Sequence, residues 1–116
     1  ADFVRSVMAD NSREHCVALY LDASNQIASY SIISIGGANS APIAPREVFQ
    51  RAVLVGAISI ILAHNHPSGG LDPSPQDRDV TERMKEAGKV MGIKVLDHVI
   101  VTDHEFRSLN DAICGW

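Results

Sequence analysis

The strongest indication of the fold is an apolar run that contains no charged residue and is followed directly by histidines. Residues 58–63 read Ile-Ser-Ile-Ile-Leu-Ala. A segment of this length and composition is typical of a strand buried on both faces, and such strands lie in the middle of a sheet. The strand is expected to end at His64, where residues 64–73 have the composition of a loop. We therefore predict a central strand that runs directly into a polar loop.

Apolar periodicity and turn residues place the other elements around this strand. Two strands with a short polar connection between them predict a hairpin. Proline and glycine positions mark where the helices begin and end. The expected helices cover residues 45–56 and 75–91, with the end of another over 3–10 and a short one over 106–112; the expected strands cover 16–21, 26–35 and 93–102. The sequence thus predicts an α/β or α+β fold, a mixed sheet flanked by helices.

The composition is that of one globular domain, over residues 1–116. Apolar residues make up 46% of the chain and charged residues 21%, which provides a core and excludes disorder. The formal net charge is −4, which argues against a dedicated surface for binding duplex DNA. The most apolar segment, residues 53–63, is too short to span a bilayer, so no membrane association is expected.

The chain start and the cysteines indicate the cellular setting. No secretory signal is present and the chain starts at Ala1 rather than methionine, so we expect the C-terminal fragment of a longer protein. Cys16 and Cys114 lie at opposite ends of the chain and are no disulfide framework, and Cys16 is expected to be a small core residue. A reducing, cytoplasmic location is therefore predicted.

Two histidines separated by one residue follow the central strand. In extended backbone, side chains at i and i+2 point to the same side, so His64 and His66 can converge on one metal ion. Asp77 is the best placed acidic residue, in the first turn of the second long helix. Two histidines and a carboxylate leave one position of a zinc ion open for water, as in catalytic sites. Helix capping by Ser74, with Asp77 three residues later, explains the same pattern. Spacing alone leaves both interpretations open.

Other polar residues near these positions have structural interpretations. His98, in the last long strand, is expected to be a hydrogen-bonded structural residue, with support of the metal as the alternative. His15 and His104 are expected at the solvated surface. Asn65, between the two histidines, is expected to point away from the metal and to order the loop.

The spacing of these residues resembles the JAMM signature of JAB/MPN-plus metalloproteases: His64-x-His66, seven residues, Ser74, two residues, Asp77. A more specific string resembles the RadC family over almost the whole chain. It comprises His64-Asn65-His66-Pro67-Ser68-Gly69, then Pro73-Ser74 and Asp77, then Asp97-His98. The resemblance implies a JAB/MPN fold, in which a curved sheet and helices form a three-layer, cytidine-deaminase-like architecture. It also implies zinc (Zn2+) at the end of one strand, with His64, His66 and Asp77 as ligands.

The resemblance further implies a catalytic glutamate upstream of the histidines. Glu14 and Glu47 are the two glutamates that precede His64. In JAMM proteins the glutamate lies just before the first core strand, which is the position of Glu14. Glu47 is explained as an acidic residue in the first turn of a helix. We therefore predict Glu14, although spacing alone does not decide between the two.

In the predicted mechanism, zinc lowers the pKa of its bound water and makes hydroxide available. Glu14 takes a proton from that water as general base and returns it to the leaving amine. Ser74 donates its hydroxyl hydrogen to the oxyanion that develops on the attacked carbonyl. A capping serine uses its oxygen as acceptor, so this hydrogen stays available.

The leading function is therefore zinc-dependent hydrolysis of an amide or isopeptide bond in a peptide or protein substrate. A DNA-repair role is the second hypothesis, because the RadC family carries that label, either as nucleic-acid binding or as phosphodiester hydrolysis. Nucleic acid is expected to be bound only through a preceding region, the helix-hairpin-helix segment of longer members. A non-catalytic interaction module is the third hypothesis, and the complete ligand set counts against it. The sequence leaves substrate and oligomeric state open.

Overall fold

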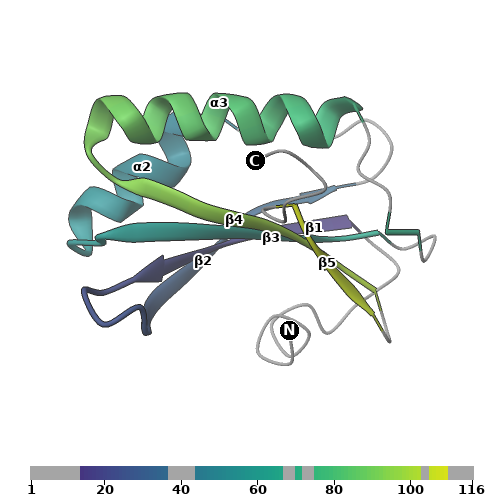
Figure 1. Ribbon diagram of the computed structural model, residues 1–116, viewed down its shortest axis with the longest axis horizontal. Coiled ribbons are helices and arrows are strands. Elements are labelled where there is room, and N and C mark those ends of the chain that lie inside the picture. Colours follow the sequence, from purple (N-terminus) through teal and green to yellow (C-terminus); the bar gives the residue numbers. More distant parts are fainter. Residues whose placement is uncertain (1–13, 37–43, 67–69, 72–74, 103–104, 110–116) are drawn as a thin grey trace.

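The computed structural model describes residues 14–36, 44–66, 70–71, 75–102 and 105–109, which form a five-stranded sheet with two helices (Figure 1). The strand order is β2-β1-β3-β4-β5. The elements are β1 (Glu14–Leu21), β2 (Ile27–Gly36), α2 (Pro45–Leu54), β3 (Ser59–Asn65), α3 (Pro75–Met91), β4 (Lys94–Val101) and β5 (Phe106–Ser108). Strands β3 and β4 are parallel and the other neighbours are antiparallel. The fold is thus α+β with a mixed sheet, as the sequence predicts.

The apolar run forms the central strand of the sheet, β3, which confirms its predicted position. It pairs with β1 on one side and β4 on the other. Its apolar residues Ile60, Leu62 and Ala63 are completely buried. The strand continues two residues further than expected, because His64 pairs with Cys16 of β1 and Asn65 continues the pairing with β4. The first polar residues therefore belong to the sheet and not to a loop.

Both described helices cover the same face of the sheet (Figure 1). The main core lies between the helices and this face; its buried members include Ala18, Tyr20, Val48, Ala52, Ile60, Leu62 and Met84. The hydroxyl of Tyr20 donates a hydrogen bond to the Val48 carbonyl of α2 (3.1 Å) and lies 2.9 Å from Ser31 Oγ of β2. The opposite face carries a smaller apolar cluster that includes Val17 and Leu19. The helix expected over residues 3–10 lies outside the described residues.

An inserted residue on β4 decides which face of the sheet His98 occupies. Ile60 pairs with Val95, but the next residue of β3, Ile61, pairs with Asp97, so that Leu96 is the extra residue. One inserted residue reverses the alternation of side chains. Val95 and His98 consequently both contact the helix-covered side, although they are three residues apart. The Asp97 carboxylate accepts hydrogen bonds from the His98 backbone N–H (2.7 Å) and from the Ser108 hydroxyl of β5.

Two predictions of local structure are wrong. Residues 106–108 form strand β5 rather than the start of a helix over 106–112, because they pair with the exposed edge of β4 and satisfy its backbone groups. The apolar pattern of residues 45–56 also predicts that Val48, Ala52, Val53 and Val55 face inward. Val53 and Val55 are instead exposed, because α2 turns its Val48 and Ala52 side toward the sheet. In the described part of the chain, neither helix is long and apolar enough to cross a membrane.

Candidate metal centre

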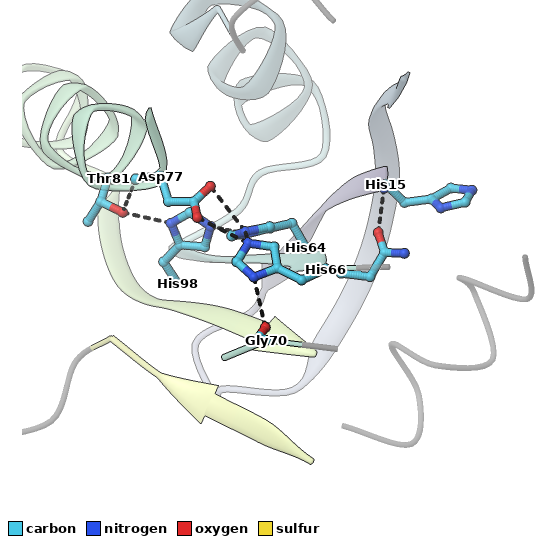
Figure 2. A network of polar contacts seen from close by, with 8 residues as sticks. His15, His64, His66, Gly70, Asp77, Thr81 and His98 are labelled. Carbon is cyan, nitrogen blue, oxygen red and sulfur yellow. Dashed lines mark hydrogen bonds and ion pairs between the residues drawn. The ribbon is translucent and has the colours of Figure 1, made fainter. Parts of the chain in front are cut away.

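The carboxyl end of β3 and the first turn of α3 bring three side chains together. His64 Nε2 and His66 Nε2 lie 2.8 Å apart. The two oxygens of the Asp77 carboxylate face them, with Oδ1 3.1 Å from His64 Nε2 and Oδ2 3.1 Å from His66 Nε2 (Figure 2). These are the three residues expected as ligands. Convergence arises because α3 packs over the sheet, along the direction of β3, with its amino end above the carboxyl end of that strand (Figure 1).

The centre is buried on one side and partly open on the other. The His64 side chain is 4% exposed, whereas His66 and Asp77 are 16% and 11% exposed. His64 lies within the sheet, and His66 is the first residue after β3. The accessible side of the centre is therefore the side of His66 and Asp77.

The chemistry of these atoms fits a divalent cation. His66 Nδ1 lies 2.9 Å from the Gly70 carbonyl oxygen, which only accepts hydrogen bonds, so Nδ1 carries the hydrogen. In the neutral ring, His66 Nε2 then directs a lone pair at the Asp77 carboxylate, and two acceptors at this distance repel unless a proton or a cation lies between them. Zinc takes imidazole nitrogens and carboxylate oxygens at about 2.0–2.1 Å, which in a tetrahedron places ligand atoms roughly 3.3 Å apart. The observed group needs to open by only a few tenths of an ångström.

His98 lies directly behind the centre. Its Nε2 is 2.7 Å from His64 Nδ1, and its Nδ1 is 2.6 Å from Thr81 Oγ1 of α3 (Figure 2). Burial, and secondarily the neighbouring His64, lower the pKa of His98 from 6.5 to about 3, so its imidazole is neutral at physiological pH. The hydrogen bonding expected for His98 is confirmed, and its partner is one of the expected metal ligands. Thr81 was not anticipated; its one sequence signal is the spacing of four from Asp77, which places both on one side of α3.

Asn65 and His15 belong to the opposite side of β3 and β1. Asn65 points away from the three side chains, as expected, and its Oδ1 accepts a hydrogen bond from the backbone N–H of His15. His15 is buried rather than solvated, because β1 begins two residues earlier than expected and includes it in the sheet. His104 lies outside the described residues.

The two residues expected to act on the substrate are only partly within the described structure. The backbone of Glu14 begins β1, two residues before Cys16, which pairs with His64. The backbone of Glu14 therefore lies at the same end of the strands as His64 and His66. Ser74 lies outside the described residues, and the side chain of Glu14 is not described. Glu47 is exposed in the first turn of α2, as the helix interpretation of this residue predicts.

Comparison with known proteins identifies the family. A family model described as "RadC-like JAB domain" matches residues 1–114. The chain belongs to the RadC-like JAB domain family. This confirms the resemblance inferred from the histidine motif, and it agrees with the mixed sheet and the position of the three side chains at the end of β3.

Relatives of this RadC-like JAB domain are similar over most of the chain. A UPF0758 protein of Desulforudis audaxviator is 46% identical over 109 residues, which cover 94% of this chain and 47% of that protein. A UPF0758 protein of Geobacillus sp. (strain WCH70) is 46% identical over 111 residues, 96% of this chain and 49% of that protein. One of Methanococcoides burtonii is 50% identical over 99 residues, 85% of this chain and 43% of that protein. The chain thus spans about half the length of these relatives, whose names state no activity.

Proposed function

We propose that this RadC-like JAB domain is a zinc-dependent hydrolase that cleaves an amide bond with a metal-activated water. The observation that carries the proposal is the convergence of His64 Nε2, His66 Nε2 and the Asp77 carboxylate at one point. Three protein ligands of this kind leave a fourth position of zinc for water, whereas structural zinc sites are closed by four ligands. The partial exposure of His66 and Asp77 supports access of a substrate to that position.

The chain's own residues would hold the ion and control the protons. When bound, zinc supplies a water of lowered pKa and polarises the carbonyl to be attacked. His64 and His66 provide neutral nitrogen ligands, and Asp77 offsets one unit of the ion's charge. Glu14 accepts a proton at its carboxylate and passes it to the leaving amine. Ser74 donates its hydroxyl hydrogen to the oxygen that gains charge.

The backbone position of Glu14 supports its role over that of Glu47. β1 is antiparallel to β3, so the start of β1 lies beside the end of β3. Glu14 begins β1, and His64 and His66 mark the end of β3. Glu47, in contrast, is an exposed residue of α2 with an ordinary place in a first helical turn.

We propose a peptide or protein as the substrate, because a net charge of −4 disfavours a polyanionic ligand. A reducing, cytoplasmic setting belongs to the same proposal, since the buried Cys16 is a thiol and not half of a disulfide.

The experiment is a screen of zinc-loaded protein against quenched fluorescent peptides and lysine isopeptides, with Glu14→Gln and Glu47→Gln compared. We expect cleavage that is abolished by a chelator and restored by zinc. Glu14→Gln should lower kcat by about 10²–10⁴-fold, and Glu47→Gln should leave it unchanged. The opposite ranking would reassign the base to Glu47. If the zinc-loaded protein cleaves neither class of substrate, the hydrolase proposal is wrong.

A further inference from the structure

A chain of three hydrogen bonds connects the two elements that carry the metal-binding side chains. It runs from His64 Nδ1 of β3 to His98 Nε2 of β4 (2.7 Å), and from His98 Nδ1 to Thr81 Oγ1 of α3 (2.6 Å). Thr81 Oγ1 in turn lies 2.9 Å from the backbone carbonyl oxygen of Asp77. The chain therefore begins at one expected ligand and ends at the backbone of another (Figure 2).

The carbonyl at the end of this chain sets the direction of every hydrogen bond in it. A carbonyl oxygen only accepts, so the hydroxyl of Thr81 donates its single hydrogen to Asp77. Thr81 Oγ1 must then accept from His98, which places the hydrogen of the neutral imidazole on Nδ1. His98 Nε2 is left as an acceptor, and His64 donates to it from Nδ1. His64 Nε2 carries no hydrogen in this arrangement.

We infer that His98 is a positioning residue that, together with Thr81, holds His64 in the tautomer whose Nε2 is free to bind the metal. This inference rests on the zinc site proposed above and adds to it residues that do not touch the ion. Zinc requires an unprotonated ring nitrogen, and hydrogen bonds to the other ring nitrogen of a ligand fix both tautomer and ring orientation. His66 is held in the same tautomer as His64, because its Nδ1 donates a hydrogen bond to the Gly70 carbonyl oxygen.

The hydrogen-bonded side chains are buried, which strengthens their hold on the His64 ring. As whole residues, His64 and His98 are 3% and 2% exposed, and Thr81 is 6% exposed. Water is therefore a poor substitute for any member, and a broken link leaves a buried polar atom without its partner. The extra residue Leu96 in β4 turns His98 toward α3, and this orientation allows His98 to contact both His64 and Thr81.

The experiment measures zinc affinity with a competing chelator in four proteins: wild type, His98→Leu, Thr81→Val and Thr81→Ser. We expect His98→Leu to weaken zinc binding by about 10–100-fold. Thr81→Val, which keeps the shape of the side chain but lacks the hydroxyl, should also weaken it. Thr81→Ser restores the hydroxyl and should recover most of the affinity. Thermal unfolding of the metal-free proteins shows whether each variant is folded, and if His98→Leu does not fold, the two Thr81 variants decide.

A second measurement reports the tautomer directly and does not depend on activity. Nitrogen-15 NMR of the zinc-loaded wild type should show His64 and His98 protonated at Nδ1. In Thr81→Val, the His98 ring should no longer be confined to this one tautomer. Variants that bind zinc as tightly as wild type would overturn the inference and leave the zinc site standing. His98 protonated at Nε2 would do the same. A wild-type protein that binds no zinc would instead refute the proposed function, and the inference with it.

Discussion

Replacing Gly88 with alanine should force α3 and the start of β4 apart. A Cβ built at this position lies 2.4 Å from the carbonyl oxygen of Ile93, in the connection between the two elements. The same connection is held by a hydrogen bond of 3.0 Å from the Ile93 N–H to the Gly88 carbonyl. Because the contacted atom belongs to the backbone and cannot rotate away, relief requires a displacement of roughly 1 Å.

The expected loss of stability follows from two opposing terms. Overpacking of this kind costs about 1–3 kcal/mol. Alanine is more favourable than glycine within a helix by about 0.5–1 kcal/mol, which offsets part of that cost. Because the required displacement is large and the contact is with backbone, we expect the clash in the upper half of that range, so the free energy of unfolding should fall by about 1–2.5 kcal/mol, which for a domain of this size lowers Tm by roughly 4–10 °C.

Urea denaturation of the metal-free protein measures this loss, with Gly92→Ala as control. Gly92 ends α3 at a φ of +71° and has no atom within 4 Å of the added Cβ. Its substitution strains the backbone without a clash, and should cost about 1 kcal/mol. A Gly88→Ala protein as stable as wild type would refute the close approach of α3 to the β4 connection.

Two further predictions concern the metal and pH. At free zinc of 100 times the wild-type Kd, zinc should stabilise the fold by about 2.7 kcal/mol, and this gain should fall to about 0.4 kcal/mol if Asp77→Asn weakens binding 100-fold. Equal thermal shifts in both proteins would exclude the Asp77 carboxylate as a ligand. Burial raises the pKa of Tyr20 above its ordinary value of 10, so the unfolded chain releases this proton first and stability should fall as pH rises above 10. Alkaline urea titrations should show a shallower fall for Tyr20→Phe than for the exposed Tyr30→Phe; parallel profiles would contradict the assignment.

The elements that could be predicted from the sequence are those determined locally. The uncharged composition of residues 58–63 is sufficient to indicate a central strand. Helix α3 has the predicted bounds, because Pro75 suits a first helical position and Gly92 adopts the left-handed conformation that ends a helix. His64 and His66 lie on one side of the chain because side chains two residues apart in extended backbone point the same way, whereas the approach of Asp77 depends on where α3 packs over the sheet.

The features that could not be predicted depend on how strands pair. The face occupied by His98 follows from the inserted Leu96, and strict alternation from Val95 would have placed His98 on the other side of the sheet. The extension of β1 to His15 and the formation of β5 are decided by backbone partners on neighbouring strands. Thr81 has only its spacing of four from Asp77 as a sequence signal, and that spacing gains meaning once α3 is placed against His98.

The zinc content of the purified protein, compared with that of a His66→Ala variant, decides whether His64, His66 and Asp77 hold a metal ion. His66 is the most exposed of the three expected ligands, so its loss is the least disruptive to the core. We expect about one zinc per chain in the wild type and almost none in the variant, with both proteins folded. Equal zinc content in the two proteins, or none in the wild type after zinc is added, would contradict this expectation.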